Sequence, residues 1–315
     1  LLGARMSGAE AEALYKREVK TGTRQGRITF LKNLRNVLVT TKADYEGALV
    51  VNRTARKLDG DDAELWNYEG QLLRVLGKFD QAIDALDKSL DIDPNSPAGH
   101  CQLGLALQAA GRFDEALESM DTGHEIGITQ KWSYDSKSLL EKAQRYVDLF
   151  ANLDDRLKAA TDSRTYRDAA ELAFVCAATD RWGSAATIYK SLLDDAALQD
   201  PAFNEAMRAQ ARYEAARMAA RAGTELGDAS DPNQPNAAGR AAWRNQALVY
   251  LQELFATYRE LMRNPAVANN MRALLGRWKL DPDLAGIRDE NRLRSLSPEE
   301  REEFRAFWML SLIHI

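Results

Sequence analysis

Lys78-Phe79-Asp80-Gln81-Ala82 recurs 34 residues later as Arg112-Phe113-Asp114-Glu115-Ala116. The same interval relates Gly70 to Gly104. One interval upstream, residues 43–48 carry a similar aromatic and small pattern. Three copies in phase indicate a structural repeat, in which each unit stacks on the next.

Residue size within one interval predicts a pair of closely packed helices. Gly70 and Ala82 are small enough to let two helices approach closely, and Trp66, Leu73 and Leu86 would fill the surrounding space. One such pair cannot bury its apolar face alone, but stacked pairs can. We therefore expect an all-α chain built as a solenoid with one concave side.

Turn and cap residues divide the interval into two helices. Gly77 is expected to end the first helix, and Asp80 is a candidate cap for the second. Asp93-Pro94-Asn95 is expected to end the pair.

These spacings resemble the tetratricopeptide repeat. The unit at 63–96 carries nearly the whole pattern, and the unit at 97–128 has His100 in place of the Trp and Ile128 in place of the Pro. A weaker unit spans 166–195. The resemblance implies a right-handed α-solenoid of tetratricopeptide-type helical hairpins that binds a protein or peptide in its concave groove.

The second half, about 130–309, is similar to the C-terminal repeat region of large bacterial serine/threonine protein kinases. The similarity lies in the stretches 209–216, 243–248, 278–289 and 296–301, in that order. No Gly-rich phosphate loop, His-Arg-Asp loop or Asp-Phe-Gly motif occurs in the sequence. We therefore expect no enzyme activity from this chain, and a kinase domain, if the relation holds, would precede Leu1.

The expected organisation has six parts, with both ends of the sequence read as cut. They are an N-terminal helical segment (1–28), three tetratricopeptide repeats (29–128), a long helix with weaker repeat-like hairpins (129–226), a flexible loop (227–239), a C-terminal helical cap (240–309) and a non-native tail (310–315).

Composition and charge limit the class of partner. The net charge of −5 gives no reason to expect nucleic acid. Residues 1–58 hold 12 Lys/Arg and 5 Asp/Glu, a balance of +7, whereas residues 59–128 hold 4 and 15, a balance of −11. Two cysteines and no apolar run of about 20 residues fit a cytoplasmic protein without a membrane segment.

One surface has a geometric reason to bind a partner. Positions on the first helix of each unit that do not pack inward should face the groove, and the candidate peptide-binding residues are Asn33, Asn67, Gln71, Arg74 and Gln108. Asn and Gln can bond a peptide backbone, and Arg74 can hold a carboxylate. The −11 balance suggests a partly basic peptide, whereas the alternative places these acids on the outer helices, where they keep the array soluble.

No catalytic residue is expected, because no His, Ser or Cys is spaced to join the acidic pairs Asp154-Asp155 and Asp194-Asp195. No metal site, cofactor or small-molecule substrate is expected either. The leading interpretation is a protein-interaction scaffold. The alternative is the regulatory or docking region of a serine/threonine kinase, and an enzyme or nucleic-acid binder ranks third.

Overall fold

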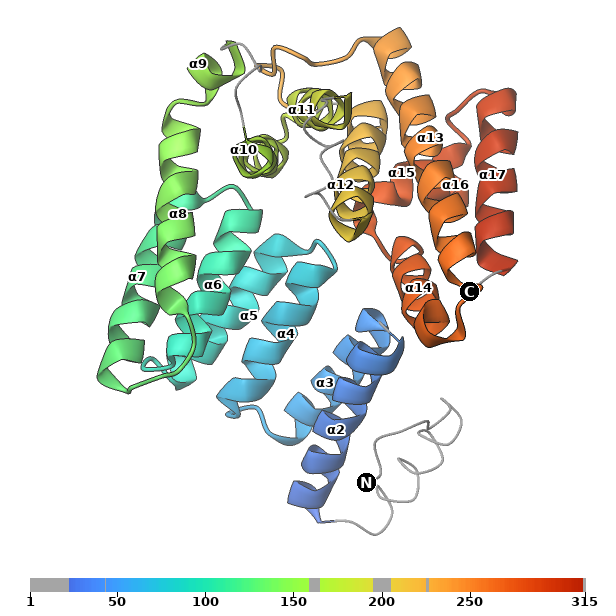
Figure 1. Ribbon diagram of the computed structural model, residues 1–315. Helices are drawn as coiled ribbons and strands as arrows, with labels where there is room; N and C mark the ends of the chain where they lie inside the picture. The colour runs from blue at the N-terminus through green and yellow to red at the C-terminus, as the bar shows by residue number, and fades with distance from the viewer. Residues whose placement is uncertain (1–22, 43, 159–164, 195–204, 225–226, 314–315) are drawn as a thin grey trace. The chain divides into compact units, whose positions relative to one another are not determined.

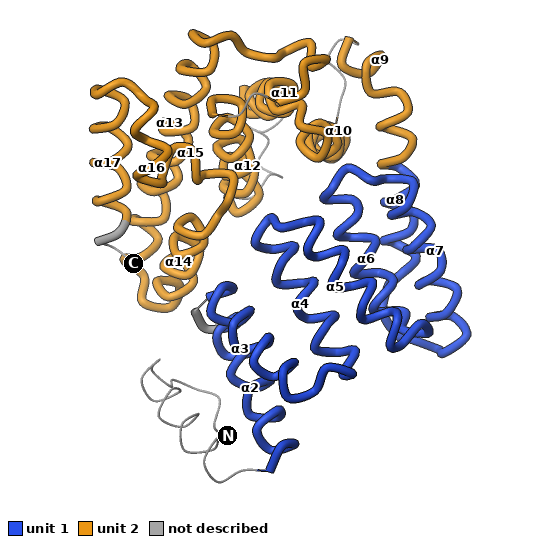
Figure 2. The backbone as a smooth tube through the Cα atoms, turned by 180° about the vertical axis from the view of Figure 1, so that it is seen from behind, with its two compact units in different colours: residues 1–145 blue, residues 146–315 orange. Residues whose placement is uncertain are grey.

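A computed structural model describes residues 23–42, 44–158, 165–194, 205–224 and 227–313 (Figure 1). Every regular element in these ranges is helical, and none is a strand, so the all-α prediction is confirmed. The chain divides into two compact units, residues 1–145 and 146–315 (Figure 2).

Unit 1 is built from helix pairs that follow the 34-residue interval. Its described elements are α2 (Arg24–Lys42), α3 (Tyr45–Leu58), α4 (Ala63–Val75), α5 (Phe79–Ile92), α6 (Pro97–Ala109), α7 (Phe113–Thr129) and the first part of α8 (Ser136–Ala151). Within each pair the helices pack together, and α3 on α4 and α5 on α6 join one pair to the next. The first pair begins at Arg24, five residues before the predicted start at 29; most of the predicted segment 1–28 lies outside the described residues.

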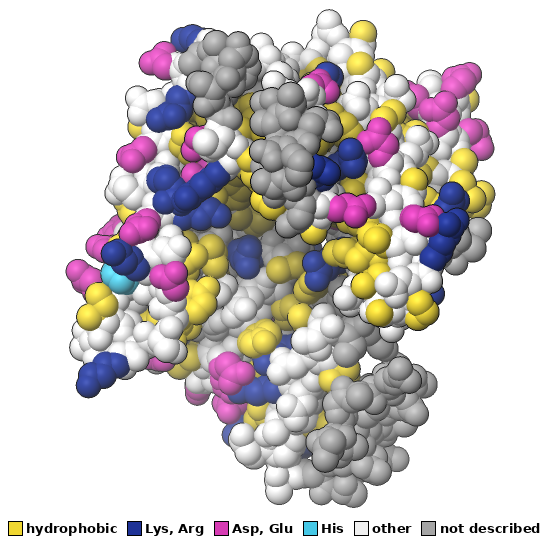
Figure 3. Space-filling model, viewed as in Figure 1, with side chains coloured by type: hydrophobic (Ala, Val, Ile, Leu, Met, Phe, Trp, Pro, Cys, Tyr) yellow, Lys and Arg dark blue, Asp and Glu magenta, His cyan; other side chains and the backbone are white. Residues whose placement is uncertain are grey.

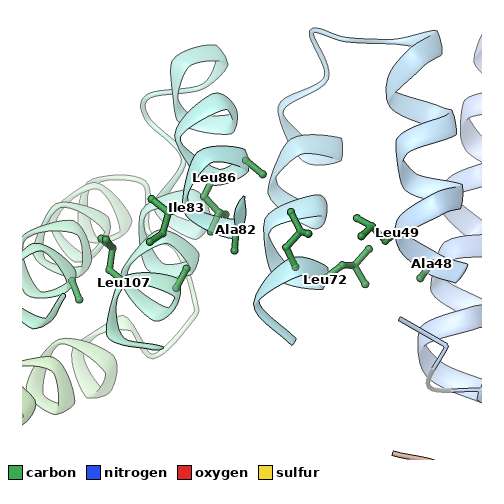
Figure 4. Packing of buried hydrophobic residues seen from close by; sticks show 11 residues of the cluster. Ala48, Leu49, Leu72, Ala82, Ile83, Leu86 and Leu107 are labelled. Carbon is green, nitrogen blue, oxygen red and sulfur yellow. The ribbon is translucent and has the colours of Figure 1, made fainter. Parts of the chain in front are cut away.

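Small residues hold these pairs close together. A Cβ on Gly70 would lie 2.4 Å from Leu86 Cγ and 3.0 Å from the backbone oxygen of Ala82. A Cβ on Gly104 would meet Met120 Cγ at 2.5 Å and the Ala116 oxygen at 3.0 Å. Leu72, Ile83, Leu86 and Leu107 form the apolar core around these contacts (Figure 4).

Helix ends follow the expected turn chemistry with one exception. Gly77 has φ of 71°, and the following Lys78 N–H donates to the Leu73 oxygen at 2.9 Å, which ends α4. The prediction of Asp80 as a cap is wrong, because α5 already begins at Phe79 and no side chain caps it. Asp80 lies instead in the exposed first turn, where its charge suits the helix dipole.

Unit 2 contains longer and less regular helices. They are the end of α8, α9 (Leu153–Lys158), α10 (Tyr166–Ala178), α11 (Trp182–Asp194), α12 (Glu205–Thr224), α13 (Ala237–Leu261), α14 (Pro265–Trp278), η2 (Pro282–Leu284), α15 (Ala285–Arg288), α16 (Glu290–Leu293) and α17 (Pro298–Ile313). The long helix predicted within 129–226 is divided between α8 and α9, and α17 continues through part of the segment interpreted as a tail. Trp278 stacks on Tyr213 and Phe307 in the core.

The loop between α12 and α13 was predicted to be flexible, but in the structure it packs against α11. Asp231 is only 4% exposed and accepts hydrogen bonds from Ser184 N (3.0 Å), Ser184 Oγ (2.5 Å) and Asn233 N (3.0 Å). Asp228 N donates to the Asp180 oxygen at 2.8 Å. A Cβ on Gly183 would lie 2.1 Å from the Asn233 oxygen, so the loop packs directly on the start of α11. Its turn-forming residues make tertiary contacts instead of leaving it free.

Candidate functional site

In the two repeats α4–α5 and α6–α7, the first helices lie closer to each other than the second helices do. α4 packs directly on α6, whereas α5 and α7 make almost no direct contact. Closer packing of the first helices makes an array of helix pairs curve, so that the first helices line its concave, inner side. The predicted binding residues all belong to the first helices of the pairs, α2, α4 and α6, and Lys32 and Arg35 of α2 pair with Glu64 of α4.

Asn67, Gln71 and Arg74 form one stripe along α4, which we call the inner stripe. Their spacing of four and three residues places them on one helix face. All three side chains are half-buried. Gln71 Nε2 donates to Asn67 Oδ1 at 2.6 Å, so the two amides stand side by side.

The corresponding positions on the neighbouring helices differ in exposure. Asn33 on α2 is exposed. Gln108 on α6 is only 4% exposed, and its Nε2 lies 3.7 Å from Met120 Sδ on α7. Cys101 is also buried, and its Sγ packs near Gly123 of α7. The expectation that Gln108 faces the groove is therefore wrong: its amide has turned into the helix pair, and α2 and α4 keep the accessible polar positions.

Arg74 is the only formal charge on the inner stripe. Burial lowers the pKa of its guanidinium. No carboxylate in the described part of the chain pairs with it, and its buried Nε donates to no acceptor there. α6 carries no Lys, Arg, Asp or Glu at all.

Eight acidic residues of the repeats lie on the outer helices. They form two exposed stripes with the same spacing, Asp80, Asp84, Asp87 and Asp91 on α5 and Asp114, Glu118, Asp121 and Glu125 on α7. Burial and the neighbouring Asp84 raise the pKa of Asp87, as expected where like charges are crowded. Eight of the 15 acids of residues 59–128 therefore belong to these outer stripes. Charged side chains of both signs also alternate over the face of the molecule seen in Figure 3.

Residues 70–111 match the family model of the tetratricopeptide (TPR) repeat. This stretch covers the end of α4, all of α5 and all of α6, which are the elements that the 34-residue interval predicts. The match spans less than half of the chain. Repeat sequence and helix pairing therefore agree in the middle of unit 1.

Two solved structures show weaker likeness. The crystal structure of MamA protein is 20% identical, with 50% of this chain and 98% of that chain covered and a TM-score of 0.28. The structure of Naa15/Naa10 bound to HypK-THB is 17% identical, with 90% of this chain and 46% of that chain covered and a TM-score of 0.32. No curated protein matches the sequence.

The side chains of Cys101, His100 and His124 are buried or make contacts within the fold. Burial raises the pKa of the Cys101 thiol to about 11. His100 Nε2 lies 3.0 Å from the Pro94 oxygen, and His124 Nδ1 lies 2.9 Å from Ser136 Oγ. Among the described residues, no three His, Cys, Asp or Glu side chains are placed to hold a metal ion, and no helix is long and apolar enough to cross a membrane.

One polar cluster in unit 2 was not anticipated from the sequence. Tyr213 donates to Asp281 Oδ2 at 2.6 Å, and Arg217 pairs with Asp281 at 3.1 Å and Asp283 at 2.5 Å. Burial and Asp281 raise the pKa of Tyr213. These bonds tie α12 to η2, so we assign the cluster a structural role. Tyr213 and Asp281 are 68 positions apart, so local sequence patterns cannot reveal this contact.

Proposed function

We propose that the chain is a protein-interaction scaffold that binds an extended peptide of a partner protein on the inner face of unit 1. The observation that carries this proposal is the inner stripe, where Asn67 and Gln71 stand side by side and only partly buried on α4. After their mutual hydrogen bond, Asn67 retains amide protons and Gln71 retains its carbonyl oxygen. Such a pair offers both a donor and an acceptor to a peptide backbone, which is what an extended chain requires.

Repeat architecture supports the same proposal. Stacked helix pairs present a continuous face to which several units contribute, and such faces are commonly used for protein binding. Asn33 on α2 is exposed and extends the polar surface beyond α4. The buried Gln108 is left out of the proposed site.

We expect a double substitution, Asn67→Ala with Gln71→Ala, to weaken peptide binding. Two lost hydrogen bonds of about 1 kcal/mol each would lower the affinity roughly tenfold or more. The measurement is a peptide-array experiment with the full 315-residue chain. Asp84→Ala with Glu118→Ala is the matched control, since it removes two exposed side chains from the outer helices. Equal binding by the wild type and the inner-stripe variant would show that this surface is not the site.

The alternative function is the regulatory or docking region of a serine/threonine kinase. It is supported by the sequence resemblance over about 130–309. Reading the coding sequence upstream of Leu1 tests it directly, because this interpretation requires a kinase domain there.

A further inference from the structure

Arg74, the last residue of the inner stripe, forms no ion pair with any described residue. It lies in the last turn of α4, and burial of its guanidinium is the sole cause of its lowered pKa. Its Nε is buried and bonds to no atom of the described residues. Withdrawing a charged group from water without a partner costs free energy, so an arginine in this state is complementary to an external anion.

The nearby acids are already engaged elsewhere. Glu64 of α4 pairs with Lys32 at 2.8 Å and with Arg35 at 3.4 Å. Glu69 is buried and pairs with Arg53 at 2.7 Å and with Arg56 at 2.8 Å. Both glutamates therefore hold α4 against α2 and α3, and neither is available to Arg74.

The remaining acids of these repeats do not form an ion pair with Arg74 either. Eight of them occupy the two exposed stripes on α5 and α7, and the other five lie at helix ends and turns. The inner side of α4 and α6 thus carries a single positive charge among uncharged groups. A basic peptide would meet repulsion there, and an acidic residue would find the only unpaired charge that the described residues of α4 and α6 carry.

The groups around Arg74 suit an extended peptide with one acidic side chain. One and two turns earlier on α4, the Gln71 and Asn67 amides can bond the peptide backbone. Val75 is 43% exposed next to Arg74 and offers an apolar contact for the aliphatic part of a bound side chain. Because α2 and α6 flank α4 on the inner side, a peptide crossing α4 continues in both directions, which favours a side-chain carboxylate over a chain terminus.

We propose that the inner stripe selects peptides with an aspartate or glutamate side chain opposite Arg74, whose guanidinium pairs with that carboxylate. This selection rests on the proposed function, since it assumes that the stripe binds a peptide. It replaces the expectation of a basic peptide that the segment charge suggested. The charge-assisted pair would supply selectivity, and the amides would supply contacts that do not depend on peptide charge.

The test uses amidated peptides that bind the wild-type chain, each made as a Glu version and a Gln version. Wild type should prefer the Glu version about tenfold at low salt, and the preference should shrink as salt is added. Arg74→Gln should abolish the preference, and Arg74→Glu should transfer it to a Lys version of the same peptide. Lys78→Gln is the matched control because it removes an exposed cation one turn farther along the chain; it should leave the preference intact.

Three results would overturn the selection. They are equal affinity of the wild type for the Glu and Gln versions, a preference that survives Arg74→Gln, and a melting temperature that falls in Arg74→Gln. The last would reveal a structural arginine, whereas an unpaired one loses no ion pair on substitution. Peptides that bind without charge preference would refute this selection alone, whereas the absence of any peptide binding would refute the proposed function as well.

Discussion

Gly70→Leu is expected to lower the free energy of unfolding by about 3 kcal/mol, at the upper end of the range for overpacking a core. Even a Cβ at this position would come within 2.4 Å of Leu86 Cγ and 3.0 Å of the Ala82 backbone oxygen. The side chain of Leu86 is fully buried and the oxygen belongs to a helix, so neither can move aside without separating α4 from α5. Urea unfolding followed by circular dichroism measures the effect.

Two other glycines provide graded controls. At Gly104 the nearest side-chain atom belongs to Met120, which is more adaptable than leucine, so Gly104→Ala should be milder than Gly70→Ala. At Gly276 on α14 a Cβ meets nothing within 4 Å, so Gly276→Ala should raise stability by roughly 0.5–1 kcal/mol through helix propensity. Similar unfolding midpoints for Gly70→Leu and the wild type would contradict the close helix contact.

Asp231→Ala is expected to destabilise unit 2 by about 3 kcal/mol. The substitution removes three hydrogen bonds to a buried carboxylate, and it leaves the Ser184 N–H and the Asn233 N–H without their acceptor. The loop over 227–236 should then detach from α11. Limited proteolysis with a broad-specificity protease should cut this loop quickly in the variant and slowly in the wild type.

The exposed neighbour Asp228 is the control for this prediction. Its side chain is 37% exposed and pairs with Arg181 at 3.4 Å, so Asp228→Ala should cost less than about 1 kcal/mol. The docked loop would be contradicted by rapid cleavage of the wild-type loop, or by equal stability of Asp231→Ala and Asp228→Ala.

The repeat interval predicted the parts of the fold that depend on local spacing. Glycine and alanine at fixed positions identified the close contact between α4 and α5, and Gly77 identified the end of α4. Such features could be recognised because a helix pair places residues of one interval in contact with each other. Asp80 was misassigned because residue type alone does not determine the first residue of a helix to better than one or two positions.

Side-chain direction was harder to predict. Gln108 occupies the repeat position of Arg74, yet its amide turns toward Met120 while Arg74 remains half-buried on the inner side. The repeat register fixes the backbone position, but the neighbouring side chain decides where a long polar group points. The contacts of the loop between α12 and α13 were equally hard to predict. Asp231 lies in a stretch of turn-forming residues, and its partner Ser184 is 47 positions away in the sequence.

The charge balance of a segment does not give the charge of each of its faces. The −11 balance of residues 59–128 suggested a basic ligand. The helix period places eight of those 15 acids on the outer stripes, and Glu64 and Glu69 of α4 are held in ion pairs. What remains on the inner stripe is Arg74, with the opposite sign.

Site-specific photo-crosslinking tests the central claim, that a peptide binds the inner face of unit 1. A benzophenone amino acid would replace Asn33, which is exposed on α2, or Asp84, which is exposed on the outer helix α5. A peptide that binds the wild-type chain should crosslink from position 33 and not from position 84, and excess unlabelled peptide should suppress the crosslink. Crosslinking from position 84 with none from position 33 would contradict the account.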